Sequence, residues 1–214
     1  MGIQKNGEKG DNYTQGVEIH AHQTVFAEGC RGSLSKQLIA QFDLQKDKSP
    51  QTYALGVKEI WQVESPHYSA GQMLHTVGWP LKNNTYGGSF VYHMANNKVA
   101  IGFVVGLDYQ NPTLSPFHEL QRFKHHPDIL PLLEGGKRLA YGAKTLVEGG
   151  VQSMPKLTAP GAVLVGDAAG TLNVAKIKGN HTAMKSGMVA AEALFEHFNA
   201  GGTGGEVVAY EVNF

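Results

Sequence analysis

The stretch VLVGDAAGTLNVAKIKGNHTAMKSGM, residues 163–188, decides how this chain is predicted to fold. Its apolar start predicts a short buried strand, which ends at Gly166 directly before Asp167. An amphipathic helix is predicted from about Asn180, and its larger apolar residues share one face at spacings of three and four: Met184, Met188, Ala191, Phe195 and Phe198. A strand, a glycine turn and a helix start in this order place backbone N–H groups beside a carboxylate. Such a turn favours a ligand that carries both an anion and hydroxyl groups.

The bulk composition narrows the class of protein. The 214 residues include 42% hydrophobic residues, which is enough for a substantial core. Lys plus Arg equals Asp plus Glu at 18 each, which argues against a nucleic-acid-binding protein. The single cysteine, Cys30, excludes a disulfide framework or a cysteine-rich metal site within the chain and favours a reducing compartment. The chain starts with polar residues, without the apolar core of a signal peptide.

The N-terminal part predicts a strand followed by a helix. Residues 16–29 alternate and then become apolar, which predicts a strand that ends at Gly29. Residues 31–42 predict a helix with Leu34, Leu38 and Phe42 on one face and Ser33 as the N-cap.

The middle of the chain predicts a mostly antiparallel sheet. Strands are expected within residues 52–63, 71–81, 85–94, 98–109 and 138–150, with a hairpin at Asn96-Asn97. A helix is expected from Ser115, its N-cap, through Pro116 at N1, and a short helical piece follows Pro127. The predicted class is therefore α/β (α+β), with an antiparallel sheet domain (49–148) inserted into an α/β domain (1–48 and 149–200). Residues 201–214 are expected to be a linker or the start of a further region.

The five residues GDAAG alone are better explained by a turn that caps a structural helix. A second motif changes this balance, because Glu28-Gly29 follows a strand and Ser33 opens a helix. This arrangement resembles the second fingerprint of two-dinucleotide-binding flavoproteins, where it lies near the FAD pyrophosphate. The pair of motifs, in this order, predicts the FAD-binding domain of such a flavoprotein.

Longer runs give a more specific resemblance. They include LHTVGWPL (74–81), YGGSF (86–90), GFVVGLDYQNPTLSPF (102–117), FKHHPDILPLLEGGKRLAYGAK (123–144), QSMPKLTAPG (152–161) and NVAKIKGNHTAMKSGMVAAEALF (173–195). Together they resemble the electron transfer flavoprotein–ubiquinone oxidoreductase family over roughly residues 1–200. The resemblance implies an FAD enzyme with regions for FAD, ubiquinone and a [4Fe-4S] cluster. Such an enzyme lies peripherally on the mitochondrial inner membrane or the bacterial plasma membrane, and passes electrons from reduced electron transfer flavoprotein to ubiquinone.

The resemblance also implies roles for individual residues. Those expected near FAD are Glu28, Gly29, Tyr86, Gly166, Asp167, Gly170, His181 and Thr182, with Thr182 at the flavin N1–C2=O edge. Gly87 and Gly88 are expected to offer bare backbone to the quinone head group. From strand patterns alone, this glycine pair is better explained by a bulge or a tight sheet crossing. No nucleophile, general base or metal ligand is expected in the chain.

The departures from the family pattern matter equally. The chain has no Gly-x-Gly-x-x-Gly motif and no set of four cysteines, so neither the first dinucleotide-binding unit nor the cluster is expected within it. We therefore expect an internal segment of the enzyme. Thr171, Ala175 and Asn180 also differ from the residues usual in the family. Two alternatives remain open: another FAD-dependent reductase of the same fold, such as a geranylgeranyl reductase, and a non-catalytic fragment that binds quinone or lipid.

Overall fold

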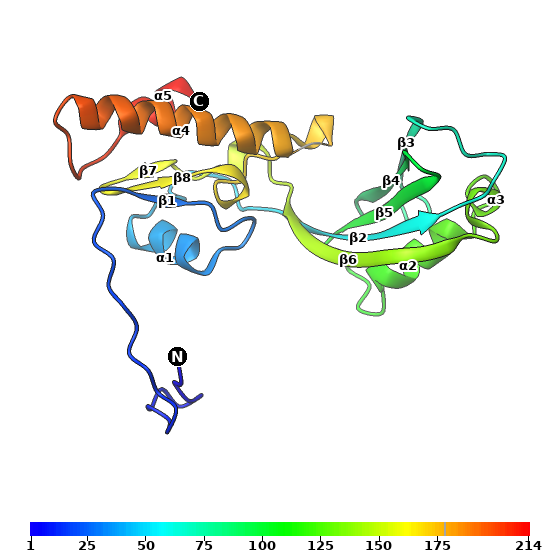
Figure 1. Cartoon of the computed structure of the whole chain (residues 1–214), viewed down its shortest axis with the longest axis horizontal. Coiled ribbons are helices and arrows are strands. Elements are labelled where there is room, and N and C mark those ends of the chain that lie inside the picture. Colours follow the sequence, from blue (N-terminus) through cyan, green and yellow to red (C-terminus); the bar gives the residue numbers. More distant parts are fainter. Residues whose placement is uncertain (178) are drawn as a thin grey trace.

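The computed structural model of the chain describes residues 1–177 and 179–214 and contains two sheets, each with its own helices (Figure 1). A three-stranded sheet lies between α1 and α4, and a five-stranded sheet carries α2 and α3. Each sheet has a separate hydrophobic cluster, one that includes Val163 and Leu164 and one that includes Ile101 and Phe103. This arrangement confirms the predicted α/β (α+β) class with an antiparallel sheet.

The small sheet has the order β1 (Thr24–Phe26), β8 (Ala162–Leu164), β7 (Thr158–Ala159). β1 and β8 are parallel, and β7 pairs with β8 in the antiparallel sense. The predicted strand over residues 16–29 is wrong for most of its length, because only residues 24–26 pair with a neighbour. Alternation alone does not form a strand where no second strand is available for pairing.

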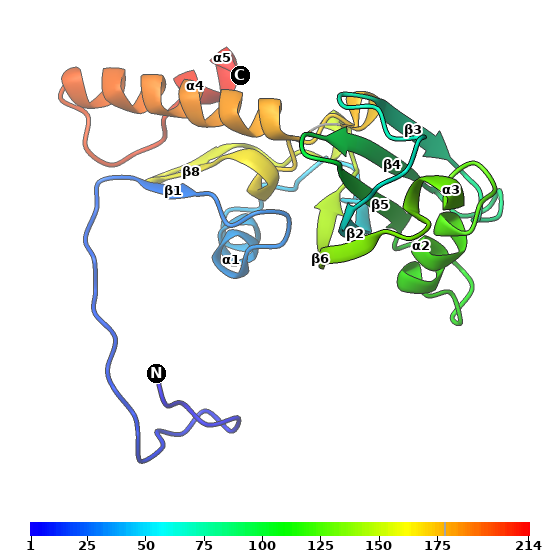
Figure 2. The ribbon, with the colours of Figure 1, turned by 45° about the vertical axis from the view of Figure 1, so that its right-hand side comes forward.

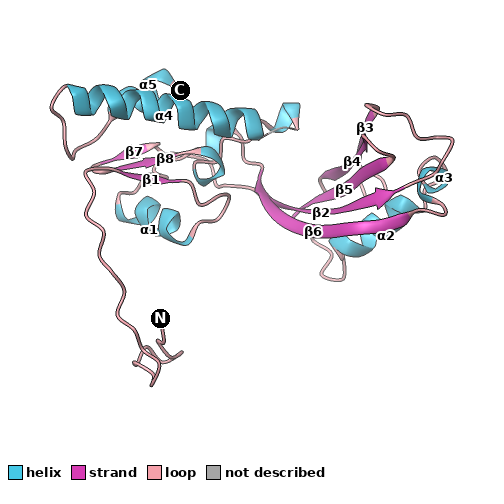
Figure 3. Ribbon diagram, in the orientation of Figure 1, coloured by secondary structure: helices cyan, strands magenta, loops and turns pink. Residues whose placement is uncertain are grey.

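Two helices cover the small sheet from opposite sides (Figures 1 and 3). α1 (Ser33–Gln41) lies on one face and α4 (Asn180–Asn199) on the other. The buried residues of α4 are mostly small: Ser186, Val189, Ala190, Ala193 and Leu194. The apolar face predicted from the sequence is the exposed one, since Met184, Met188 and Phe195 are each more than half exposed. Small side chains let the helix approach the strands closely, so they take the inner face.

The C-terminal residues differ from the expected linker. They turn back as α5 (Val208–Asn213), which packs beside α4 and β7. Tyr210 is fully buried in the small-sheet core, and its hydroxyl donates a hydrogen bond to the Leu164 carbonyl at 2.9 Å. Burial raises the pKa of Tyr210 to about 12. Residues 206–214 therefore belong to the same folded unit as β8.

The five-stranded sheet is antiparallel throughout. Its order is β3 (Met73–Val77), β4 (Gly87–Met94), β5 (Lys98–Gly106), β2 (Tyr53–Gln62), β6 (Lys137–Val147). Asn96 and Asn97 have φ values of 60° and 52°, which confirms the predicted hairpin because both turn positions are left-handed. β2 and β6 pair from Tyr53–Val147 to Gln62–Lys137, with an irregularity between Ile60 and Trp61.

Helices α2 (Pro116–Lys124) and α3 (Leu130–Leu133) cover one side of this sheet (Figure 2). The Ser115 hydroxyl accepts a hydrogen bond from the His118 N–H at 3.4 Å, as expected for the predicted N-cap. No helix in the described residues is long and apolar enough to span a membrane.

Two neighbouring segments join the sheets, one leading into β2 and one leaving β6 (Figure 3). The Gln51 side chain ties them together, because its Oε1 accepts from the Gly149 N–H at 2.8 Å. Three short 3₁₀ helices follow β6 along the chain: η1 (Val151–Ser153), η2 (Gly166–Ala168) and η3 (Val174–Lys176). The chain around η3 lies on the side of the large sheet opposite α2. The neighbouring residues Phe103 and Val104 of β5 point to opposite faces: Phe103 packs with α2, whereas Val104 lines a pocket together with Val174.

Candidate functional site

A pocket of about 490 Å³ lies where the parallel strands β1 and β8 end and α4 begins. Gly29 follows β1, Gly166 and Asp167 follow β8, and Asn180 opens α4. The carboxyl ends of parallel strands and a helix N-terminus form the usual ligand crevice of open α/β sheets. The large sheet closes the other side with Phe90, Val104 and Leu146.

Asp167 is the polar centre of this pocket. Its Oδ1 atom is buried and has no hydrogen-bond partner in the described part of the chain. Burial raises the pKa of Asp167, and the Lys144 ammonium partly offsets this. A buried carboxylate oxygen without a donor is costly, so the site is suited to a ligand that brings hydroxyl groups.

The glycines around Asp167 shape the loop. Gly29, Gly166 and Gly170 have φ values of 80°, 59° and 76°, a region that residues with side chains rarely adopt. The Gly166 N–H donates to Ser186 Oγ at 2.8 Å, so it fixes η2 against α4 and is not free for a ligand. The N–H groups of the first turn of α4 are the ones that a helix start leaves for an anion.

Glu28 has a different task from the one expected. Its carboxylate accepts hydrogen bonds from Ser35 N–H at 2.6 Å, from the Ser35 hydroxyl at 2.8 Å and from Leu34 N–H at 3.3 Å. These bonds lower the pKa of Glu28, and the bond from the Ser35 N–H has the largest effect. The predicted Ser33 N-cap is wrong: Gly32 occupies the cap position without a side-chain bond, and Glu28 caps α1 from outside the helix.

The other expected cofactor residues lie around the pocket rather than all within it. Thr182 Oγ1 donates to the Gly179 carbonyl at 2.9 Å and lines an adjacent pocket that contains Thr171 and Gly170. His181 is exposed at the start of α4. The structure thus brings Gly29, Gly166 and Asp167 together, and leaves the Thr182 and His181 roles as predictions.

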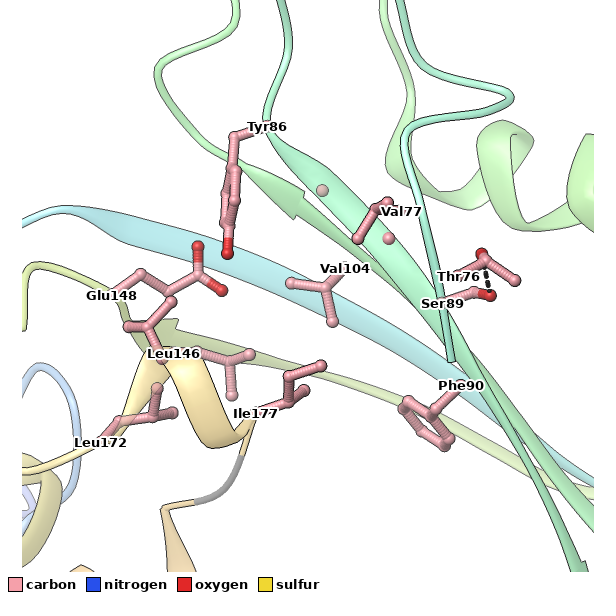
Figure 4. A pocket seen from close by; sticks show the side chains of 13 residues that line it. Thr76, Val77, Tyr86, Ser89, Phe90, Val104, Leu146, Glu148, Leu172 and Ile177 are labelled. Atoms are coloured by element: carbon pink, nitrogen blue, oxygen red, sulfur yellow. Dashed lines mark hydrogen bonds between the residues drawn. The ribbon is translucent and has the colours of Figure 1, made fainter. Parts of the chain in front are cut away.

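A second, smaller pocket of about 100 Å³ lies against β4 (Figure 4). Tyr86, Gly87 and Gly88 form one wall, and Val77 at the end of β3 lies beside them. The other lining residues are mostly apolar and include Val104, Leu146, Leu172, Val174 and Ile177. The two pockets share five lining residues, which are Phe90, Val104, Leu146, Leu172 and Ile177. The two pockets are therefore adjacent.

The paired glycines have a structural reason as well. A Cβ atom on Gly87 would collide with the Val104 carbonyl oxygen, and one on Gly88 with the Thr76 carbonyl oxygen. β4 therefore approaches both neighbouring strands more closely than a side chain allows, as the tight-crossing interpretation predicts. The same glycines leave bare backbone on the pocket wall, so the two interpretations do not compete.

Glu148 is a pocket residue that the sequence interpretation did not select. It directly follows β6, lines the second pocket, and has a buried Oε2 atom without a partner in the described residues. Burial raises the pKa of Glu148, and the Asp108 carboxylate raises it further. Burial also raises the pKa of Tyr86, and the Glu148 carboxylate raises it further. The sequence signal that could have identified Glu148 was an acidic residue at the end of a predicted strand, directly before two glycines.

Comparison with known proteins identifies the family. The family model described as ETF-QO, ubiquinone-binding, matches residues 53–146, which run from the start of β2 to the end of β6. Electron transfer flavoprotein-ubiquinone oxidoreductase of Bos taurus is 54% identical over all of this chain and 36% of its own length. The probable enzyme of Saccharomyces cerevisiae is 54% identical over 91% of this chain and 31% of its own length.

Solved structures share the fold at lower identity. A geranylgeranyl bacteriochlorophyll reductase-like protein of Thermoplasma acidophilum has a TM-score of 0.63 at 19% identity, over 84% of this chain and 42% of that one. A point mutant of halogenase PltM in complex with FAD has a TM-score of 0.59 at 16% identity, over 89% of this chain and 40% of that one. This likeness supports the predicted flavoprotein fold and no particular activity.

The bovine protein matches this chain over its whole length. The chain itself spans only 36% of the length of the bovine protein. The matched ubiquinone-binding region coincides with the five-stranded sheet, and the Asp167 loop adjoins it. From the sequence and the fold together, the chain belongs to the electron transfer flavoprotein-ubiquinone oxidoreductase family.

Proposed function

We propose that this chain supplies the ubiquinone site and part of the FAD site of an enzyme that passes electrons from electron transfer flavoprotein to ubiquinone. The adjacency of the two pockets, which share five lining residues, carries the proposal. One holds a carboxylate with an unpaired buried oxygen near a helix start, and the other is a mostly apolar slot lined mainly by the matched ubiquinone-binding region. Electron transfer between two bound groups needs such adjacency and needs no nucleophile.

The residues of the first pocket fit a dinucleotide. Asp167 would accept hydrogen bonds from ribityl or ribose hydroxyl groups, which supplies the donor that its Oδ1 lacks. The start of α4 would face negative charge on the cofactor, and a helix N-terminus stabilises such charge by up to ~2 kcal/mol. FAD bound there would supply the redox chemistry. Glu28 would act indirectly by holding α1 in place, and Gly29 would leave room beside β1.

The second pocket fits a flat, neutral ring. Val104, Leu146 and Leu172 provide apolar contact, while backbone N–H and C=O groups at Gly87 and Gly88 provide polar anchors. Tyr86 lies on the same wall, with its hydroxyl end toward Glu148 (Figure 4). The identity of 54% to the named oxidoreductases, against 19% to the geranylgeranyl reductase-like protein, favours quinone over another substrate of this fold.

The remaining partners lie outside this chain. We propose that electron transfer flavoprotein is the donor and that the [4Fe-4S] ligands come from elsewhere in the full-length protein. The mitochondrial relatives favour a peripheral location on the inner mitochondrial membrane. Val77 lines the pocket and is 84% exposed, and Trp79, which follows β3, is 47% exposed. Both would face the lipid that supplies the quinone.

The proposed function can be tested with a variant that makes the quinone pocket smaller and leaves Gly87 and Gly88 unchanged. In the full-length protein, Val77→Phe should raise the KM for a short-chain ubiquinone analogue at least tenfold, because the larger ring enters the slot from its rim. Flavin reduction by electron transfer flavoprotein should stay unchanged. Met73→Phe is the matched control, since Met73 lies four residues earlier on β3, is 68% exposed, and does not line the pocket. Equal quinone kinetics in both variants would exclude this pocket as the quinone site.

A further inference from the structure

We propose that Glu148 is a proton donor to the quinone, an inference that rests on the function proposed above. Glu148 lines the same pocket as Tyr86, Gly87 and Gly88, and the Tyr86 hydroxyl points toward its carboxyl group (Figure 4). A side chain there touches a ring bound in the slot, which makes it a candidate catalytic residue.

The backbone holds Glu148 in place. It directly follows β6, and its N–H donates to the Thr52 carbonyl at 2.7 Å across the junction with β2. The next residue, Gly149, donates to Gln51 Oε1 at 2.8 Å. The side chain therefore projects from a fixed point, and its Oε2 atom is buried without a partner in the described part of the chain.

The groups around Glu148 favour its neutral form. On the pocket wall itself, Tyr86 is the neighbouring side chain that titrates; η3 contributes Val174 and Ile177, and β5 contributes Val104. Asp108, in the connection after β5, adds a second negative charge. Lys144 on β6 acts on Asp167 and Cys30, and it is not among the groups that shift Glu148. Burial and Asp108 thus both raise the pKa of Glu148.

The chemistry needs such a group. Reduction of a quinone to a quinol takes two electrons and two protons, and forms one O–H bond at each carbonyl oxygen. The electrons come from the reduced flavin of the full-length enzyme. The Glu148 carboxyl O–H bond breaks as one carbonyl oxygen takes the proton, and solvent returns a proton to the carboxylate. The second proton comes from solvent at the mouth of the pocket.

A neutral Glu148 is also favoured before reduction, when oxidised quinone is bound. Quinone carbonyl oxygens only accept hydrogen bonds, so an ionised carboxylate beside them would repel the ring. A protonated carboxyl group donates to the carbonyl and becomes more effective as negative charge develops on that oxygen. The neutral form is therefore complementary to both the bound quinone and the developing charge.

The first test is Glu148→Gln in the full-length protein. Quinone reduction should fall on the order of 10²-fold, the usual scale for loss of a general acid, with little change in KM for the quinone analogue. Flavin reduction by electron transfer flavoprotein should stay unchanged. The wild-type rate should decline as pH rises through the pKa of Glu148, and the variant should lose this decline. Glu64→Gln, an exposed carboxylate just beyond the far end of β2, is the charge-matched control.

The second test leaves Glu148 in place. Asp108→Asn removes a negative charge, lowers the pKa of Glu148, and should shift the alkaline decline to lower pH. Infrared spectroscopy gives a reading that is independent of turnover: at neutral pH the wild type should show a protonated carboxyl band that Glu148→Gln lacks. If Glu148→Gln fails to fold, the pH profile of quinone reduction by Asp108→Asn tests the proposal instead, and an alkaline decline that does not shift would contradict it.

Two results would overturn the proposal: full quinone turnover in Glu148→Gln, or an ionised Glu148 at neutral pH. Failure of the quinone site itself is distinguishable, because Val77→Phe would then leave quinone kinetics unchanged. If Val77→Phe blocks turnover and Glu148→Gln does not, the pocket stands and the proton donor is wrong.

Discussion

At the scale of single residues, three carboxylates of this chain differ in state because their surroundings differ. Glu28 accepts hydrogen bonds at the start of α1, and its pKa is lowered. Asp167 and Glu148 are half-buried beside the two pockets, each has one buried oxygen without a partner in the described residues, and burial raises both pKa values. The first is committed to structure, whereas the other two remain available to ligands.

The Glu28 cap leads to a direct prediction. Glu28→Ala should speed hydrogen exchange at the Leu34 and Ser35 amides, because both lose their acceptor. Ser33→Ala is the control and should leave exchange unchanged, since Ser33 makes no capping bond. The Glu28 pKa is lowered on folding, so its contribution to stability is present above its unfolded pKa and is lost as pH falls through the folded one. Faster exchange in Ser33→Ala alone would restore Ser33 as the cap.

At the scale of elements, an ion-pair cluster joins α2 to the large sheet. Glu59 on β2 is only 1% exposed; Lys124 Nζ lies 2.7 Å from its Oε2, and Trp61 Nε1 donates to the same oxygen at 2.7 Å. Arg138 on β6 lies 3.4 Å from Oε1. Burial alone would raise the pKa of Glu59, but the bonds from Lys124 and Trp61 outweigh it and the pKa is lowered. The cluster therefore keeps a buried charge at the helix–sheet contact.

Removing Lys124 should expose how much this contact depends on it. Lys124→Met should destabilise the protein by about 3–5 kcal/mol, because it leaves the Glu59 carboxylate buried without its nearest cation. Chemical denaturation measures the loss. Adding Glu59→Gln should recover part of it, and the exposed Lys58→Met should be nearly neutral. Since the Glu59 pKa is lowered, its stabilisation should fade as pH falls through that value. A loss below about 1 kcal/mol in Lys124→Met, the scale of an exposed ion pair, would mean that Arg138 and Trp61 suffice.

At the scale of the whole molecule, the candidate site lies between two sheets with separate cores. The large sheet supplies the apolar slot, and the small sheet supplies the Asp167 loop. The small sheet has an open edge, because β1 is its terminal strand and Val25 is 48% exposed. The outer face of α4 is apolar and exposed. Both features indicate that the cofactor side of the site is the less complete half.

The isolated 214-residue chain should therefore bind FAD weakly or not at all. The Asp167 pocket is lined by Gly29 and Asp167 from the two later motifs, and the chain has no Gly-x-Gly-x-x-Gly motif for the cofactor pyrophosphate. Purification followed by visible flavin absorbance gives the stoichiometry. The full-length protein, purified in the same way, is the positive control. A yellow isolated chain with one FAD per molecule would contradict the prediction.

Local rules were sufficient for much of this fold. Asn96-Asn97, Ser115-Pro116 and the alternating strands of the large sheet depend on neighbouring residues, and each was predicted from the sequence and is present in the structure. Asp167 was also predicted from its place between a buried strand and a helix start, and it lies in the pocket. The family itself followed from long runs of sequence.

Tertiary structure decided what depends on distant partners. The period of α4 predicts an apolar face, but contact with the strands selects the small residues Ser186 and Ala190 for the inside. Glu28 caps a helix that begins several residues later, and Glu148 becomes a pocket residue only because β6 returns beside β2. Periodicity and turn chemistry act over a few residues, whereas burial and the loss of hydrogen-bond partners are set by segments far apart in the chain.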